Sequence, residues 1–141
     1  MSSSGTFDIL NSLKSQGFKM TPVRKTLVEV LLTSSSPLSI MEILQILKQK
    51  GLNPNKTTVY REIDFLKNRQ ILQEIEFGDG KKRYEISKTH HHHIICVNCG
   101  LIKDITMEKD LNKEEQKVIK KTGFKPIGHS LEFFGLCSNC Q

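Results

Sequence analysis

Apolar residues in the first half of the chain recur at the three- and four-residue spacing of helices with one buried face. Thr21 and Pro22 begin one of these helices as its N-cap and first residue. Ser39 and Glu42 form a capping box for the next. The pattern predicts four short helices, over residues 7–15, 22–33, 40–50 and 55–68.

The pattern changes from helical to alternating after residue 71. Two short alternating segments, 72–77 and 82–86, flank Gly78-Asp79-Gly80, which indicates a β-hairpin. Short helices followed by a hairpin are the order of a winged helix, with the fourth helix in the recognition position. The face of this helix opposite its apolar stripe suits contacts to phosphates and base edges; a solvated polar face is the alternative. The residues on this face are Lys56, Thr57, Tyr60, Arg61 and Asp64.

The second half of the chain predicts a smaller unit of mixed structure. Strands are expected over 94–97, 101–105 and 127–134, and a helix over about 109–122. Ser87-Lys88-Thr89 reads as a short hinge between the halves. We therefore predict an α+β protein with a winged-helix domain at 1–86, a hinge at 87–89 and a small α/β domain at 90–141.

Composition adds three expectations. The 141 residues include no Trp and seven Phe, which argues against one large core, and small domains often need a metal or disulfide staple. Residues 1–84 carry 13 Lys and Arg against 8 Asp and Glu, so a polyanionic partner is expected. The first six residues lack the features of a signal peptide, and no apolar run is long enough to span a bilayer. We expect a cytoplasmic protein with no membrane partner and with reduced thiols.

All four cysteines occur in two CxxC pairs, Cys96-Val-Asn-Cys99 and Cys137-Ser-Asn-Cys140. Each pair can place two sulfurs around one ion, and two pairs complete a closed tetrahedral zinc site that holds structure. The 37 residues between the pairs exceed the roughly 15–20 of a zinc ribbon, so the ion is expected to join distant strands. A redox or thiol-sensing function of the pairs is the competing hypothesis.

Four consecutive histidines, His90 to His93, directly precede the first CxxC pair. In an extended segment alternate side chains point to opposite faces, so His91 and His93 would serve one metal site and His90 and His92 another. Imidazole suits zinc, iron and related ions, and carboxylates should complete each shell. A solvated histidine cluster without a specific metal is the alternative. The candidate partners of the histidines are Glu85, Asp104, Glu108, Glu115 and His129.

Enzymatic activity is not expected. The chain has no P-loop, no G-x-S-x-G motif and no H-E-x-x-H motif. A thiol nucleophile would need a cysteine outside the two CxxC pairs, and the sequence has none.

Taken together, these features resemble the ferric uptake regulator family of bacterial metal-responsive repressors, over about residues 17–140. The resemblance implies a homodimer, formed through the second domain, that binds a palindromic operator in double-stranded DNA. The segments that carry it are Gly17-Phe-Lys-Met-Thr-Pro-Val-Arg24, Thr57-Thr-Val-Tyr-Arg61, His90-His-His-His-Ile-Ile-Cys-Val-Asn-Cys-Gly100, Gly123-Phe124, His129-Ser-Leu-Glu-Phe-Phe-Gly135 and Cys137-Ser-Asn-Cys140.

The resemblance also implies roles for individual residues. The four cysteines would hold structural zinc, while Lys19 and Arg24 would approach the DNA backbone or minor groove. The regulatory site on the hinge side would comprise Glu85, His91, His93 and Asp104. The second site, within the dimerisation domain, would comprise His90, His92 and His129. All residues predicted to contact DNA are Lys19, Arg24, Lys56, Thr57, Thr58, Tyr60 and Arg61.

Three positions bear on the ligands and on the metal. Pro37 stands where many family members have a histidine that joins the hinge-side site. Asn112 stands where the resemblance implies a carboxylate ligand of the second site. Glu108 and Glu115 lie one helical turn to either side of Asn112 and could supply that carboxylate instead. His92 stands where iron-sensing members commonly carry Asp, so the resemblance favours the zinc uptake regulator branch.

The sequence therefore predicts a zinc-responsive repressor of metal-homeostasis genes. Metal ligation across the hinge would fix the DNA-binding domains at the spacing of the operator. An iron- or manganese-responsive repressor of the same family is the alternative, and a peroxide sensor ranks third because that branch relies on the histidine replaced by Pro37. A zinc trafficking or storage protein, and a regulator switched by oxidation of the CxxC pairs, are hypotheses of other classes.

Overall fold

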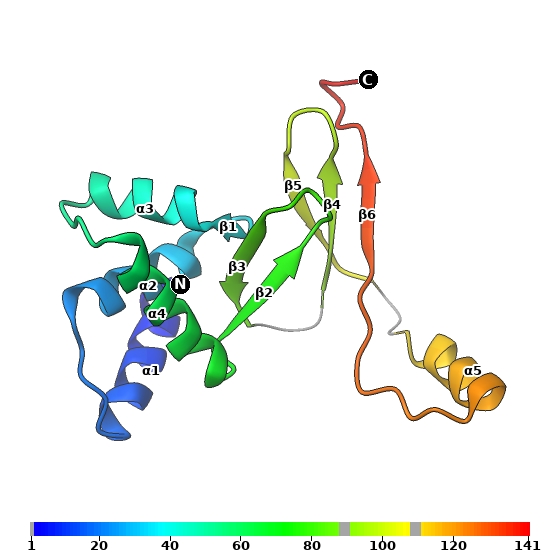
Figure 1. The fold of residues 1–141 in the computed structure, drawn as a ribbon, viewed down its shortest axis with the longest axis horizontal. Helices are drawn as coiled ribbons and strands as arrows, with labels where there is room; N and C mark the ends of the chain where they lie inside the picture. The colour runs from blue at the N-terminus through cyan, green and yellow to red at the C-terminus, as the bar shows by residue number, and fades with distance from the viewer. Residues whose placement is uncertain (1, 88–90, 108–110) are drawn as a thin grey trace. The chain divides into compact units, whose positions relative to one another are not determined.

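The computed structural model describes residues 2–87, 91–107 and 111–141, and the chain divides into two compact units, 1–88 and 89–141. The first unit combines helices with a small antiparallel sheet of strand order β1-β3-β2 (Figure 1). Together the two units give the predicted α+β fold. The elements of the first unit are α1 (Ser2–Ser15), α2 (Pro22–Thr33), β1 (Leu38–Ser39), α3 (Ile40–Gln49), α4 (Lys56–Asn68), β2 (Leu72–Glu76) and β3 (Lys82–Ile86).

The predicted order of helices and hairpin is confirmed, with two differences. The first helix begins at Ser2, ahead of the apolar positions that predicted it from residue 7. The strand β1 was not predicted, because two residues are too few to show an alternating pattern; Leu38 pairs with Tyr84 of β3. This short strand fixes the base of the hairpin beside the helices.

The apolar stripes of the helices meet in one core. Val59, Ile63 and Leu66 of α4 are fully buried, as the sequence predicted. The capping box of α3 is also confirmed: the Glu42 backbone N–H donates to Ser39 Oγ at 3.3 Å, and the Ser39 N–H donates to Glu42 Oε2 at 2.7 Å. The largest fully buried side chains are Leu13, Leu27, Val28, Ile43, Leu47, Val59, Ile63, Leu66 and Leu72.

Helix α4 ends in a left-handed residue that is not glycine. Gln70 has a φ of 59°, and the next N–H, that of Ile71, donates to the Leu66 carbonyl at 3.1 Å. A residue with a side chain destabilises the folded state by roughly 1–2 kcal/mol in this conformation. Glycine avoids that cost but loses roughly 0.5–1 kcal/mol more conformational entropy on folding.

We therefore expect Gln70→Gly to raise the free energy of unfolding by about 0.5–1 kcal/mol, measured by urea unfolding. Gln49→Gly is the matched control, because Gln49 is the exposed last residue of α3 and is right-handed. That control should lose stability; a loss in both variants would contradict the expectation.

The second unit is a three-stranded sheet with one helix beside it in the chain. β4 (His92–Cys96) lies between β5 (Ile102–Ile105), its antiparallel partner, and β6 (Glu132–Gly135), its parallel partner (Figure 1). Helix α5 (Asn112–Thr122) ends at Gly123, whose φ is 72°. Among the described residues, no helix has the length and apolarity needed to cross a membrane.

The last predicted strand, 127–134, was too long. The observed strand covers residues 132–135 only, and the Ile127 side chain is fully exposed. The pairing with β4 starts at His93 and Glu132, so residues 127–131 have no strand beside them to complete a ladder. An apolar residue at position 127 therefore marks exposed surface and not a buried strand.

Candidate metal centres and DNA-binding surface

The four cysteines lie together at one edge of the second sheet. β4 and β6 run parallel with Cys96 opposite Gly135, so the turns that follow these two strands leave from the same edge. Cys96 is the last residue of β4 and Cys99 lies in the turn after it, while Cys137 and Cys140 follow the end of β6. Their four Sγ atoms all lie within 4.8 Å of one another. Parallel pairing thus brings the two CxxC pairs around one point.

The geometry and chemistry of this cluster fit zinc. Cys99 Sγ and Cys137 Sγ are 3.8 Å apart, and thiolates bound tetrahedrally at about 2.3 Å from an ion are themselves about 3.8 Å apart. The backbone N–H groups of Cys99 and Cys137 donate to the Cys96 sulfur and lower the pKa of this thiol to about 6. Backbone donors therefore stabilise the thiolate, which is the form that binds a metal.

A second group of donors lies further along β4. His93 and Asp104 are register partners on β4 and β5, and His91 is two residues before His93. The Nε2 atoms of His91 and His93 are 3.1 Å apart. Asp104 Oδ1 lies 3.4 Å from His93 Nε2 and 3.9 Å from His91 Nε2. Donor atoms bound at about 2.0–2.1 Å to one ion are about 3 Å apart, so these three side chains fit a common metal.

Glu85, the fourth residue predicted for this site, belongs to the first unit. It is buried on β3, where Gln73 Nε2, on the neighbouring strand, donates to its Oε1 at 2.6 Å. Its participation in a site with His91, His93 and Asp104 stays a prediction.

On the opposite face of β4, His92 points toward the predicted second site. The His92 and His129 ring centroids are 5.8 Å apart, and Glu115 Oε1 of α5 lies 2.8 Å from His129 Nδ1. His92 Nδ1 is 3.1 Å from the Leu131 carbonyl, which assigns its proton to Nδ1 and leaves the lone pair on Nε2. The structure thus brings Glu115 to His129, whose ring lies near that of His92, while His90 and Glu108 lie outside the described residues.

The residues predicted to contact DNA take two kinds of position. Lys56, Thr57, Tyr60 and Arg61 are exposed on the first turns of α4, and Thr58 is half-buried beside them. Lys19 is exposed in the linker before α2. Arg24 differs, because its side chain is 12% exposed and its guanidinium pairs with Glu62. A role of Arg24 in touching DNA stays a prediction.

Two basic residues of the hairpin were not predicted as DNA contacts. A groove of about 340 Å³ lies between the start of α3, helix α4 and the hairpin tip, and its lining includes Lys56, Tyr60, Lys81 and Lys82. Lys81 and Lys82 extend the basic surface of α4 onto the hairpin. The signal was in the sequence, since two lysines follow the Gly78-Asp79-Gly80 turn directly.

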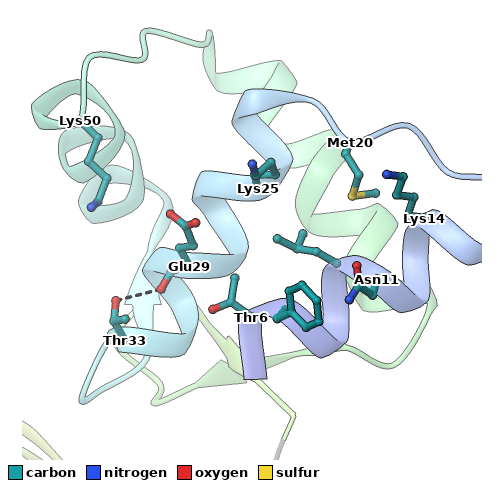
Figure 2. A pocket seen from close by; sticks show the side chains of 10 residues that line it. Thr6, Asn11, Lys14, Met20, Lys25, Glu29, Thr33 and Lys50 are labelled. Atoms are coloured by element: carbon teal, nitrogen blue, oxygen red, sulfur yellow. Dashed lines mark hydrogen bonds between the residues drawn. The ribbon is translucent and has the colours of Figure 1, made fainter. Parts of the chain in front are cut away.

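A larger pocket, of about 610 Å³, lies among α1, α2 and the end of α3. Figure 2 shows Lys14, Lys25 and Lys50 around it, with Thr33 Oγ1 donating to the Glu29 carbonyl. The pocket lining contains none of the predicted site residues.

Comparison with known proteins identifies the family. The model of the ferric uptake regulator family matches residues 15–134. The chain belongs to the ferric uptake regulator family. It is 34% identical to the ferric uptake regulation protein of Bacillus subtilis, over 94% of this chain and 92% of that one. It is 32% identical to the peroxide-responsive repressor PerR of Staphylococcus saprophyticus, over 95% of this chain and 90% of that one. The solved ferric uptake regulator of Helicobacter pylori has a TM-score of 0.79 and 33% identity, covering 100% of this chain and 94% of that one.

Membership confirms the broader predictions. Members of the ferric uptake regulator family are metal-responsive transcription regulators and not enzymes, and they bind DNA as dimers. The family match ends at residue 134, before Cys137 and Cys140, so the assignment of that CxxC pair rests on the sulfur geometry. The relatives compared are iron and peroxide regulators, and the zinc branch stays a prediction.

Proposed function

We propose that this chain is a zinc-responsive repressor that binds a palindromic operator as a homodimer. The observation that carries the proposal is the convergence of His91, His93 and Asp104 next to the predicted hinge at 87–89. Glu85, at the end of the hairpin, would complete the ligand set from the DNA-binding side. A ligand set drawn from both sides of a hinge favours one arrangement of the two domains.

Metal and operator would then select the same arrangement of the domains, and each would raise the affinity for the other by an equal factor. Moving a two-state equilibrium from 1:99 to 99:1 takes about 5.5 kcal/mol of differential binding. Two or three metal–ligand bonds per protomer, made only in the closed arrangement, are sufficient for that.

The proposal of zinc rests on donor type. Two imidazoles with carboxylates suit zinc, and the unbroken histidine run supplies a third imidazole at His92 for the second site. The oxygen donors equally suit iron or manganese, and the Bacillus subtilis relative is named for ferric uptake. An iron- or manganese-responsive repressor is therefore the second candidate, and metal reconstitution separates the two.

DNA contact is proposed for the exposed side of α4 and the adjoining basic groove. Tyr60 and Arg61 would read base edges, and Lys19 and Lys56 would meet phosphates, with Thr57 and Thr58 at the helix start. Lys81 and Lys82 would add phosphate contacts from the hairpin. In a homodimer, two such helices would enter successive major grooves of a palindrome.

Homodimerisation through residues 90–141 is supported by apolar surface on that unit. No described residue of α5 is buried, although Val118 and Ile119 are apolar. Ile94 of β4 and Phe133 of β6 are more than a third exposed as well. Monomeric proteins seldom leave so much adjoining apolar surface in water.

We also propose up to three metal sites per protomer, as described for the Helicobacter pylori regulator, whose structure is reported to reveal three functional metal-binding sites. The four cysteines would hold structural zinc. His91, His93, Asp104 and Glu85 would hold the regulatory ion. His90, His92, His129 and Glu115 would hold a third, with Glu108 as the other candidate carboxylate.

Metal reconstitution tests the proposal. After removal of all but the cysteine-bound zinc, we expect added zinc to restore tight binding to one palindrome from a genomic fragment library at constant salt. Ferrous iron and manganese are added singly to parallel samples. Restoration by iron or manganese instead would assign the second candidate. If no metal yields a specific complex while zinc still binds in several equivalents, the chain handles zinc and does not repress.

A further inference from the structure

Arg24 is held by three hydrogen bonds to other groups of the protein. Its Nε and Nη2 donate to the two carboxylate oxygens of Glu62 at 2.8 and 3.2 Å, and its Nη1 donates to the Lys19 carbonyl at 2.7 Å. The side chains of Arg24 and Glu62 are 12% and 14% exposed. Bidentate pairs of this kind fix orientation as well as distance.

The same guanidinium belongs to an aromatic cluster on α4. Arg24 Cζ lies 3.7 Å from the Phe65 ring centroid, and Arg69 Cζ lies 3.8 Å from it. Arg69 also stacks on Phe18 at 4.1 Å, and Phe18 meets Phe65 edge to face with centroids 5.0 Å apart. Stacking of cations on rings adds attraction to the packing. We call Arg24, Glu62, Phe65, Arg69 and Phe18 the arginine clamp.

The clamp occupies its own side of α4. Glu62, Phe65 and Arg69 are three and four residues apart, so they share one side of the helix. That side lies between the buried stripe and the exposed side that carries Tyr60 and Arg61. The clamp partners come from the linker and from the start of α2, so they fix how far α4 is turned about its axis.

We propose that Arg24 is a positioning residue for the recognition helix, and not a residue that touches DNA. This inference rests on the proposed operator binding. Through its contacts with Glu62 and Phe65, Arg24 sets the rotation of α4 about its axis. Through its hydrogen bond to the Lys19 carbonyl, it also fixes the position of the linker from which the Lys19 side chain extends. One guanidinium thereby fixes the spacing between the helix that reads bases and a lysine proposed to meet the backbone.

Burial of the guanidinium argues against direct contact. Three of its five N–H groups donate inside the protein, and the Arg24 side chain is only 12% exposed, so a phosphate could reach it fully only if Arg24 turned outward and gave up these partners. Releasing Arg24 would also leave the Glu62 carboxylate without its bidentate partner. Leaving a partly buried charge in this way is costly.

Two substitutions separate positioning from contact. If Arg24 touched DNA, Glu62→Gln would release a cation and remove a negative charge, and operator binding would strengthen. If Arg24 positions the helix, Glu62→Gln and Arg24→Gln should both weaken operator binding, by about tenfold or more, the loss of roughly one good base contact. The double variant should lose little more than either single variant.

The salt dependence of binding gives a readout that simple loss of stability does not move. Loss of one direct phosphate contact reduces the slope of log K against log salt by about 0.9. We expect that reduction for Lys19→Gln, and no further reduction when Arg24→Gln is combined with Lys19→Gln, because Arg24 itself makes no phosphate contact. Lys25→Gln is the matched control, since it removes a neighbouring charge on α2 that lies outside the clamp and should leave operator affinity nearly unchanged. Operator DNA is titrated with each variant as the full-length, metal-loaded protein. The active fraction of each variant is determined by stoichiometric binding.

Stronger binding by Glu62→Gln would overturn the positioning role, and so would a slope that Arg24→Gln reduces by about a further 0.9 in the Lys19→Gln background. So would wild-type affinity in both clamp variants. A wild-type protein that forms no specific complex would instead overturn the proposed function, and the inference with it.

Discussion

Replacing Cys96 with Ser is expected to remove the structural zinc and to prevent the second unit from folding and dimerising. The described part of this unit has a very small core, in which Ile95, Cys96 and Ile102 are the only buried apolar residues. Binding of structural zinc in small domains contributes an apparent 10–16 kcal/mol, roughly speaking. That contribution is comparable to the total stability of an ordinary domain, about 5–15 kcal/mol. Removing one ligand should therefore cost most of the stability of residues 89–141.

The measurements are zinc per protomer, mass in solution and thermal unfolding of the full-length protein. We expect one fewer tightly bound zinc, monomeric or aggregated protein, and loss of one unfolding transition. The transition of the first unit should remain, because its core is separate and larger. Ser138→Ala is the matched control within the second CxxC turn, and it should keep zinc and dimer. A Cys96→Ser protein that retains both would refute the structural zinc.

Local signals in the sequence were sufficient for most of the first unit. The stripe of Val59, Ile63 and Leu66 and the capping box at Ser39 depend on spacing within one helix, and both were found as predicted. Caps and stripes act over three or four residues, so they are legible in a sequence. The short strand β1 was not, because its existence depends on Tyr84 and Arg83 of a strand distant in sequence.

The metal clusters were predictable as residue types and only partly as groups. Alternation along β4 separates His91 and His93 from His92 without any knowledge of the fold. Register is different: Asp104 meets His93 because β4 and β5 pair at those residues, and spacing alone does not give that pairing. The approach of Glu115 to His129 likewise depends on how the chain returns from α5 to β6.

Arg24 shows a further reason why the role of a residue is hard to predict from sequence. A basic residue in a basic half of the chain suggests a nucleic-acid contact, and the family resemblance suggests it too. Its partners, Glu62 and Phe65, are 38 and 41 residues away in the chain. The charge is neutralised inside the protein, which no composition or charge pattern reveals.

Replacing His91 and His93 together with Ala is expected to abolish metal-dependent operator binding while leaving a folded dimer. These rings supply both nitrogen donors of the hinge-side cluster. Without them only the carboxylates of Asp104 and, in the proposed site, Glu85 remain, which are too few donors to hold the ion tightly against water. The four cysteines proposed to bind structural zinc are separate from these histidines, at the edge where β4 and β6 end, so the second unit should keep its structural zinc. Coupling between effector and ligand is typically about 1–3 kcal/mol, or roughly 5- to 150-fold in affinity. The variant should lose that factor and bind operator equally with and without added metal.

Operator titrations with and without added metal measure this loss, alongside metal content and mass in solution. Lys103→Ala is the matched control, since Lys103 is exposed on β5 next to Asp104 and is not a ligand. It should keep the full metal response. If the double histidine variant still responded to metal, the domains would not be coupled through this cluster. The second group at His92, His129 and Glu115 would then be the regulatory site, and His129→Ala would be the variant that loses the response, because its ring meets both other side chains.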